Sequence, residues 1–398
     1  MEKKALPIEE LQFGMYVAAL DRPWSETPFM FQGFHLRTDQ QLAALRKLCK
    51  LVYIDMERSE TAGARPPAPQ FRIRGSAAYP EKANVEIEFR QARTVYEQSA
   101  AGLGDLLAPL SKPGGVLEGK EVKESVTRLT DSVVRNPDAL LLVTRLRDKS
   151  AKAHARALQV SIYMIVFARF LALEREELEL LGLLGLLQDV GKTRLPAALL
   201  EKNAPLSPEE VELAKLHVEH SRDILKATPG LPEKLPELAL LHHERQDGSG
   251  YPRGLKGEQI GLYGSVAAIA DTFDALTAAR PYAEPLSPSS ALSYLYRERG
   301  TGFHSELVEQ FIQCVGAFPV GSVVELNSGE TGIVITQNLV RRLKPRVMVV
   351  LDAQGQPMRP QKILDLDKDP NARPGEPYRI RRSLDQTKLQ VDPKDLLL

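Results

Sequence analysis

A nearly apolar run from Leu178 to Leu187, in which Glu179 is the one charged residue, constrains the fold more than any other stretch of the chain. The run is too short to cross a membrane, because a spanning helix needs about 18 or more apolar residues. It is apolar on nearly every side, as are helices that lie in the interior of a protein. The run therefore predicts the central helix of a helical bundle. Gln188 and Asp189 follow it directly, where this buried helix is expected to end.

The rest of the chain divides into a helical middle and two flanking units. The strand-like segments MYVAAL and LVYID, with a helical segment between them, predict a small α+β domain over residues 1–60. Residues 61–125 combine an Ala- and Pro-rich linker with a charged helical segment, and residues 126–317 have the pattern of successive helices. β-branched runs between turn residues predict a small β unit with an irregular tail over residues 318–398. The expected fold is multidomain and mainly α.

One helix start carries a specific capping signal. In the sequence LSPEE, Ser207 precedes Pro208, and Glu210 lies three residues after the serine. This spacing is typical of a capping box, in which the serine and glutamate side chains bind each other's backbone N–H groups.

The composition excludes several classes of protein. The 52 Lys and Arg residues balance 52 Asp and Glu residues, which argues against a dedicated binder of long nucleic acid. The N-terminus lacks the apolar core of a signal peptide, and no membrane span is expected. The two cysteines, Cys49 and Cys314, lie far apart in apolar helical contexts. A disulfide framework is therefore not expected, and a cytoplasmic location fits.

Histidine and aspartate residues in the helical middle suggest a metal site. Imidazole and carboxylate groups without thiolates suit Fe, Mn or Zn in a hydrolytic or oxygen-handling role. Taken singly, each residue has an ordinary alternative as a solvated histidine or a surface acid. Their joint occurrence, in order, within one helical region favours the metal site. The candidate ligands are His154, Asp189, His217, His242, His243 and Asp271.

Asp271 and Asp274 lie beside an apolar stripe with helical spacing in the sequence IADTFDALTAARPY. The two aspartates are three residues apart, so they share one face of the predicted helix. A carboxylate that borders an apolar face needs a partner or a metal ion, because burial of an unpaired charge is costly.

The strings LLQDVGK, HHERQDGSGYP and IADTFDALTAARPY resemble the HD-GYP branch of the HD phosphohydrolases, over roughly residues 130–315. That family has an all-helical fold with a bi- or trinuclear metal centre, and it hydrolyses the bacterial messenger cyclic di-GMP. Residues 4–55 resemble the short domain of unclear role that often precedes HD-GYP. The segment after residue 318 resembles the one that follows it.

The resemblance implies roles for individual residues. The family's metal ligands correspond to His154, Gln188, Asp189, His217, His242, His243 and Asp271. Contacts to phosphate or base are implied for Lys192, Tyr251, Asp274 and Arg280, with Asp189 and Lys192 as the catalytic residues. Two divalent ions are expected, with Fe or Mn as the first choice and Zn as the alternative. Some members bind a third ion through a carboxylate at the position of Ser150, so two ions are the expected maximum here.

Gln188 departs from the family pattern, because it replaces the histidine of the HD pair. An amide oxygen is a weaker donor to a transition metal than imidazole. Loss of even an outer partner of a ligand typically costs about 10–100-fold in metal affinity or activity. Two functions are therefore left open. One is a slow phosphodiesterase that hydrolyses cyclic di-GMP to pGpG and further to GMP. The other is a degenerate member that acts as a sensor or scaffold. It would bind cyclic di-GMP, or it would bind a diguanylate cyclase (GGDEF) domain through the loop that contains the GYP sequence of this chain. A homodimer is a further expectation.

Overall fold

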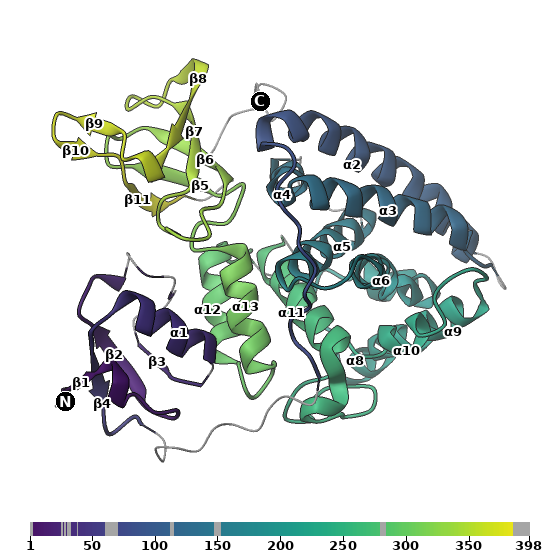
Figure 1. Ribbon diagram of the computed structural model, residues 1–398. Helices are drawn as coiled ribbons and strands as arrows, with labels where there is room; N and C mark the ends of the chain where they lie inside the picture. Colours follow the sequence, from purple (N-terminus) through teal and green to yellow (C-terminus); the bar gives the residue numbers. More distant parts are fainter. Residues whose placement is uncertain are drawn as a thin grey trace.

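The computed structural model describes residues 3–24, 27, 29, 33–37, 39–59, 71–111, 115–146, 153–278 and 284–384, without the side chains of Gln40, Ser111, Ala153 and His154. The described chain forms a helical bundle, with a small sheet-containing unit before it and a second sheet after it (Figure 1). This arrangement confirms the predicted mainly α fold with two smaller units. Among the described residues, no helix is both long and apolar enough to cross a membrane.

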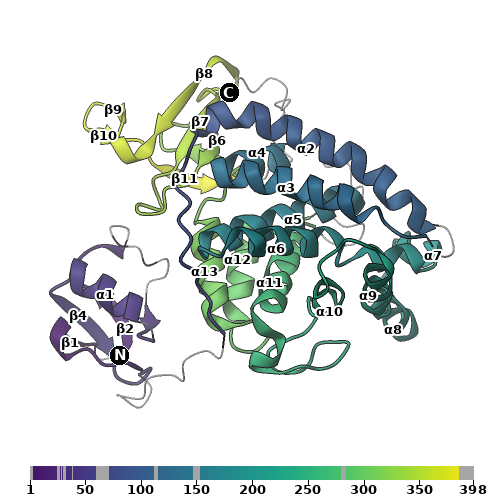
Figure 2. The same cartoon turned by 45° about the vertical axis from the view of Figure 1, so that its right-hand side comes forward.

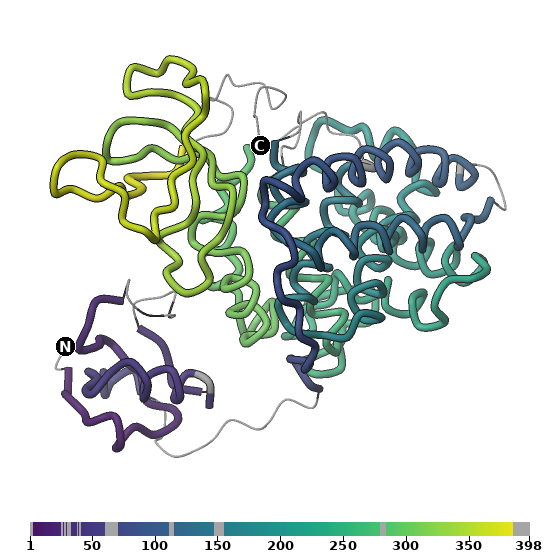
Figure 3. Tube along the Cα trace, turned by 45° about the horizontal axis from the view of Figure 1, so that its top comes forward, coloured from purple at the N-terminus to yellow at the C-terminus, as the bar shows by residue number. Residues whose placement is uncertain are grey.

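The N-terminal unit is a four-stranded antiparallel sheet in the order β1-β4-β2-β3. Both predicted strands are present, and the predicted helix lies between them in sequence. Val17, Val52 and Ile54 belong to an apolar core that is separate from the core of the bundle. Figure 3 shows the unit as a distinct body. Its elements are β1 (Lys3–Pro7), β2 (Tyr16–Leu20), β3 (Phe34–His35), α1 (Asp39–Leu48) and β4 (Leu51–Asp55).

The centre of the bundle is formed by α5 (Ala153–Phe170) and α6 (Arg175–Leu187), which pack closely against each other. Every residue from 180 to 187 is buried, which confirms the predicted central helix. The Ser161 hydroxyl donates a hydrogen bond of 2.7 Å to the carbonyl oxygen of Gly182. A Cβ atom at Gly185 would lie 2.7 Å from Ser161 Cα, so a larger residue there would push the two helices apart.

Other helices surround this central pair. The long helix α2 lies along the outer side of α3 (Figure 2), and α11 packs against both α5 and α6. The preceding helices are α2 (Val85–Leu107), α3 (Gly119–Arg135) and α4 (Pro137–Leu146). The following ones are η4 (Val190–Arg194), α7 (Ala197–Leu200), α8 (Pro208–Lys215), α9 (His217–Ala227), α10 (Leu235–Ala239), η5 (Gly257–Ile260), α11 (Gly261–Thr277), α12 (Pro288–Arg297) and α13 (Ser305–Val315).

The C-terminal strands form a five-stranded antiparallel sheet in the order β11-β5-β6-β7-β8, and β9 pairs with β10. The predicted β unit is therefore present. The strands are β5 (Val323–Leu326), β6 (Thr331–Thr336), β7 (Arg346–Leu351), β8 (Pro357–Asp365), β9 (Asn371–Arg373), β10 (Glu376–Pro377) and β11 (Ile380–Ser383).

Both faces of the two central strands are buried. In β6, Ile333 and Ile335 belong to the apolar core of the helical bundle, whereas Val334 between them belongs to a second core on the other face. The same alternation in β7 assigns Met348 to the bundle core and Val347 to the second core. Successive side chains of a strand point to opposite faces, so this sheet forms part of the bundle core and also covers a small core of its own.

Asp138, the second residue of α4, links this sheet to the bundle. Its side chain is 7% exposed, and Oδ2 accepts a hydrogen bond of 3.0 Å from the backbone N–H of Gln337, just after β6. Burial raises the pKa of Asp138 from its ordinary value of 3.8 to about 7. The folded protein therefore holds a proton here at a pH where the unfolded chain has lost it.

We expect this carboxyl group to lower the stability of the fold as pH rises. Between about pH 4 and pH 7 the folded state binds more protons than the unfolded state, so the free energy of unfolding falls with pH and levels off above that range. Between pH 5 and pH 8, the free energy of unfolding of the wild type should fall by about 3 kcal/mol more than that of an Asp138→Asn variant. Urea unfolding at both pH values measures this difference. Asp131→Asn, at a half-exposed carboxylate paired with Arg175, is the control. If the free energy of unfolding changes equally with pH in the wild type and in Asp138→Asn, the expectation is refuted.

Candidate metal centre

Asp189 is positioned by the turn that ends the central helix. Helix α6 stops at Leu187, and the chain then turns through Asp189 into η4. η4 packs tightly on α9, because a Cβ atom at Gly191 would lie 2.1 Å from the carbonyl oxygen of His217. The Gly191 N–H also donates a hydrogen bond of 2.8 Å to the Ser221 hydroxyl. The glycine of DVGK thus brings Asp189 next to the start of α9.

His217 and His242 are both buried, and each is fixed by a backbone carbonyl group. Nδ1 of His217 lies 2.6 Å from the carbonyl oxygen of Ala214, and Nδ1 of His242 lies 2.8 Å from that of Ala239. A carbonyl oxygen only accepts hydrogen bonds, so each Nδ1 carries the hydrogen. In the neutral ring, Nε2 then has a free lone pair, which is the form in which histidine binds a metal ion.

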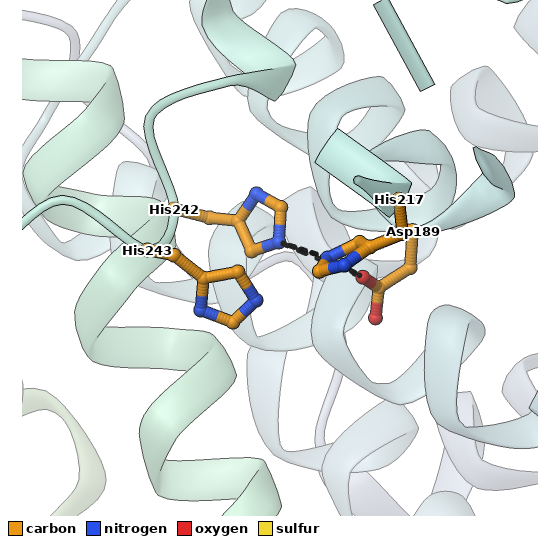
Figure 4. A group of neighbouring side chains, drawn as sticks. All are labelled: Asp189, His217, His242 and His243. Carbon is orange, nitrogen blue, oxygen red and sulfur yellow. Dashed lines mark hydrogen bonds and ion pairs between the residues drawn. The ribbon is translucent and has the colours of Figure 1, made fainter. Parts of the chain in front are cut away.

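The free atoms of these residues converge on one point. Asp189 Oδ1 lies 3.2 Å from His217 Nε2 and 3.5 Å from His242 Nε2, and the two Nε2 atoms are 3.4 Å apart. With His243 they form a group in which one possible ligand atom from each residue lies within 4.8 Å of every other (Figure 4). Figure 4 shows His242 and His243 facing His217 and Asp189 across this point. We call these four residues the ligand group.

The ligand group fits a bound cation. Three electron-rich atoms with no hydrogen between them repel one another, and a positive ion at their centre would turn the repulsion into attraction. Asp189 Oδ1 is buried without a hydrogen-bond partner among the described residues, and so is Oε1 of the neighbouring Gln188. Buried polar atoms normally have partners, so these orphaned oxygens support a cation site. Three imidazoles and a carboxylate suit a divalent transition metal.

The surrounding charges keep these residues in their metal-binding forms. Burial alone would raise the pKa of the Asp189 carboxyl, but the charge of Lys192, whose Nζ lies 2.5 Å from Oδ2, holds that pKa well below its usual range. Burial and the neighbouring His242 lower the pKa of His243, which keeps that ring neutral. Ionised carboxylate and neutral imidazole are the states that bind metal ions.

Glu244 holds the segment that borders the ligand group, residues 248–255, which we call the GYP loop. The Glu244 side chain is 1% exposed, and each of its carboxylate oxygens accepts one backbone hydrogen bond. The donors are the N–H groups of Arg253, at 2.8 Å, and Leu255, at 2.9 Å. Sequence analysis does not assign this clamp, because the acceptor and donors are separated by nine and eleven residues of irregular chain.

Tyr251 of the GYP loop lies directly against the ligand group. Its backbone N–H donates a hydrogen bond of 3.2 Å to the carbonyl oxygen of His243. Its ring stacks on the His243 ring, with centroids 4.7 Å apart and an angle of 24° between the planes. Burial and the Asp189 charge raise the pKa of Tyr251, so its hydroxyl remains a hydrogen-bond donor at neutral pH.

Asp271 and Asp274 on α11 lie outside the ligand group. The two residues are 6% and 1% exposed, so neither is a surface acid. Both contact the guanidinium group of Arg156 on α5: Nη2 lies 3.2 Å from Asp271 Oδ1, and Nε lies 3.1 Å from Asp274 Oδ2. The shared helix face predicted for the two aspartates is present. Arg156 was not predicted as their partner, because nothing in the local sequence pattern pairs a residue on α5 with two on α11.

The other predicted site residues have different outcomes. His154 lies on α5, but its side chain is outside the described residues, as are Ser150 and Arg280. His242 and His243 lie in a turn shortly after the end of α10. Lys192 and Tyr251 border the ligand group, whereas Asp274 is buried against Arg156. The roles of all these residues in metal or substrate binding stay predictions.

Comparison with known families divides the chain into three matched segments. Residues 141–307 match the HD domain, and residues 3–112 match a domain of unknown function (DUF3391). Residues 323–373 match a KOW domain associated with HD domain. The chain is 30% identical over 371 residues to the cyclic di-GMP phosphodiesterase PA4108 of Pseudomonas aeruginosa. The aligned segment covers 92% of this chain and 89% of that protein. The chain belongs to the HD-GYP family.

Two further relatives match shorter parts of this HD-GYP protein. The cyclic di-GMP phosphodiesterase response regulator RpfG of Xanthomonas campestris pv. campestris is 39% identical over 147 residues, 37% of this chain and 39% of that one. The 3'3'-cGAMP-specific phosphodiesterase 2 of Vibrio cholerae is 33% identical over 173 residues, 43% of this chain and 33% of that one. All three relatives are named phosphodiesterases of cyclic dinucleotides, which supports a hydrolase function for the HD-GYP domain.

Proposed function

We propose that this HD-GYP protein is a metal-dependent phosphodiesterase that hydrolyses cyclic di-GMP to linear pGpG and further to GMP. The observation that carries the proposal is the ligand group, in which three imidazoles and one carboxylate meet at a point that needs a cation. The name of PA4108, which matches nearly the whole chain, supports cyclic di-GMP as the substrate.

The residues around the ligand group suit phosphodiester cleavage. A divalent ion held by Asp189 and the three histidines would supply a water of lowered pKa and positive charge for the phosphate oxygens. Lys192 Nζ lies against Asp189 Oδ2 and is 39% exposed, so it offers a further positive charge to a phosphate. Tyr251 offers a hydroxyl donor and a ring face at the edge of the group. The carbonyl groups of Ala214 and Ala239 hold the two buried imidazoles in position, which reduces the reorganisation needed on binding.

We expect Fe or Mn in this site, as the family resemblance implies, with Zn as the alternative. It contains no thiolate, because both cysteines are buried elsewhere, Cys49 in the N-terminal core and Cys314 in the bundle core. Nitrogen-rich sites with a carboxylate accept all three metals, so the choice is left to metal analysis. The dinuclear centre implied by the family resemblance needs a second set of ligands that includes His154 and Asp271. The ligand group accounts for one ion.

A second function is favoured by Gln188. A glutamine in place of a ligand histidine weakens metal binding, which fits a protein that binds cyclic di-GMP without cleaving it. Such a protein would act as a sensor or as a scaffold for a GGDEF domain that docks on the GYP loop. Titration calorimetry with cyclic di-GMP and with an isolated GGDEF domain measures both interactions. Light scattering tests the expected homodimer.

Turnover of cyclic di-GMP distinguishes the two functions. The full chain is loaded anaerobically with Fe(II) or Mn(II) and incubated with cyclic di-GMP, and the products are separated by chromatography. Formation of pGpG or GMP supports the phosphodiesterase. Nucleotide binding without product would reject it in favour of the sensor. 3'3'-cGAMP serves as the competing substrate, because one relative is named for it.

Replacing Gln188 by histidine tests the departure from the family pattern. We expect Gln188→His to retain more metal after dialysis and to hydrolyse cyclic di-GMP about 10–100-fold faster, because imidazole is the stronger donor. Metal analysis and initial rates measure the two effects. Gln188→Ala is the matched control, since it removes the amide without adding a ligand, and it should show neither gain. If Gln188→His behaves like the wild type in both assays, this position does not limit the site.

A further inference from the structure

Asp271 and Asp274 place two negative charges in the interior of the bundle. They lie one turn apart on α11, both nearly fully buried. Two carboxylates at such a distance repel each other, and neither is solvated by bulk water. An arrangement of this kind needs a positive charge beside it. In this fold the charge could come from a metal ion or from a side chain.

Arg156 supplies that charge from the neighbouring helix α5. Its guanidinium group bridges the two aspartates, with Nη2 on Asp271 and Nε on Asp274. A guanidinium group stays protonated in proteins, and its planar array of donors suits carboxylate partners. The Asp271 carboxylate, a candidate ligand of a second metal ion, is therefore already paired through Oδ1 with a permanent cation.

We propose that Arg156 takes the place of a second metal ion, so that this protein binds one metal ion per chain, at the ligand group. The inference rests on the proposed function only in treating Asp189, His217, His242 and His243 as the metal centre. A metal ion at Asp271 would have to displace the guanidinium group or share a carboxylate with it. Both options are unfavourable, because two cations repel each other more strongly in a buried site than in water.

Gln188 points independently to the same result. The second ion that the family resemblance implies would lie between His154, Asp189, Asp271 and the position of Gln188. A neutral amide at position 188 binds a transition metal more weakly than imidazole does. The Asp271 carboxylate of the same site is paired with Arg156. One site has thus lost a ligand and gained a competing cation. The guanidinium group retains one property of a metal ion, a fixed positive charge beside Asp271, but it cannot lower the pKa of a bound water.

The number of metal ions per chain tests this inference directly. Wild type, Arg156→Gln and the control Arg169→Gln are loaded with Mn(II) under anaerobic conditions and freed of excess ion. Elemental analysis counts the ions, and electron paramagnetic resonance separates isolated Mn(II) from coupled pairs. We expect one isolated ion in the wild type and in Arg169→Gln, whose guanidinium group binds the Tyr79 carbonyl oxygen away from this site. Arg156→Gln should approach two ions and show a coupled signal.

Two outcomes would overturn the inference. One is two ions per chain in the wild type, and the other is a single ion in a folded Arg156→Gln variant. If Arg156→Gln does not fold without metal, its melting temperature should rise with Mn(II) far more than that of the wild type, and an absence of this rescue would also count against the inference. Arg156→Lys keeps the charge and should remain at one ion.

The Gln188→His variant separates the effect of the arginine from that of the glutamine. With Arg156 in place, Gln188→His should not exceed one ion per chain. The double variant Gln188→His, Arg156→Gln should bind two metal ions per chain. Two ions in Gln188→His alone would show that the glutamine, and not the arginine, excludes the second metal. None of these counts uses a substrate, so a failure to hydrolyse cyclic di-GMP would refute the proposed function and leave this inference standing.

Discussion

Asp189→Asn is expected to lose its bound metal and nearly all hydrolysis of cyclic di-GMP. Asp189 contributes the only carboxylate of the ligand group, and Lys192 maintains its charge. Asparagine has the same shape but no charge, so it cannot balance a divalent ion. Because the loss of an outer ligand partner already costs about 10–100-fold, removal of an ionised ligand should lower turnover by at least about 1,000-fold.

The control for this variant is Asp223→Asn. Asp223 lies on α9, half-exposed, and is paired with Arg222 at the surface. It should keep full metal content and activity, since a single surface ion pair contributes about 1 kcal/mol or less. Circular dichroism and metal analysis on both proteins separate loss of the ion from loss of the fold. If the Asp189→Asn protein still contains metal and still hydrolyses cyclic di-GMP, Asp189 is not a metal ligand.

Glu244→Gln is expected to destabilise the fold and disorder the GYP loop. The buried carboxylate accepts two backbone hydrogen bonds, and an amide would direct an N–H group at one of the two donors. A hydrogen bond to a charged group contributes about 1.5–3 kcal/mol, so the free energy of unfolding should fall by about 3 kcal/mol. Tyr251 would lose its fixed place on His243, which should raise KM for cyclic di-GMP more than it reduces metal content.

The chain provides a matched control at Glu237. Its carboxylate binds the side chain of Arg253, 2.6 Å from Nη2, whereas Glu244 binds the backbone of the same residue. Both partners of this second contact are exposed, so Glu237→Gln should change stability by less than about 1 kcal/mol. Urea unfolding and limited proteolysis of residues 248–255 measure the two effects. Equal stability losses in the two variants would argue that Glu244 does not hold the loop.

Features that depend on neighbours in the sequence were predicted well. The apolar run before Gln188 specified a buried central helix, because a helix that is apolar on every side has no stable position at a surface. The LSPEE sequence specified the start of α8: the Glu210 N–H donates to the Ser207 hydroxyl, and the Ser207 N–H donates to the Glu210 carboxylate. Both patterns are complete within a few residues.

Features that depend on packing between distant segments were not predicted. Glu244 holds the GYP loop against the turn that carries His242 and His243, through hydrogen bonds to backbone nine and eleven residues away. The contact of Arg156 with Asp271 and Asp274 spans more than a hundred residues of chain. Sequence analysis indicated that the two carboxylates need a partner, but the identity of that partner follows only from how α5 crosses α11.

The sheet near the C-terminus has a consequence for biosynthesis. Ile333, Ile335 and Met348 complete the same apolar interior that surrounds the central helices, yet they are synthesised only after all of those helices. A nascent chain that ends after α13 would leave this interior open to solvent. The protein should therefore reach its native packing only after translation has passed β7, and messenger truncations before that point should yield insoluble products.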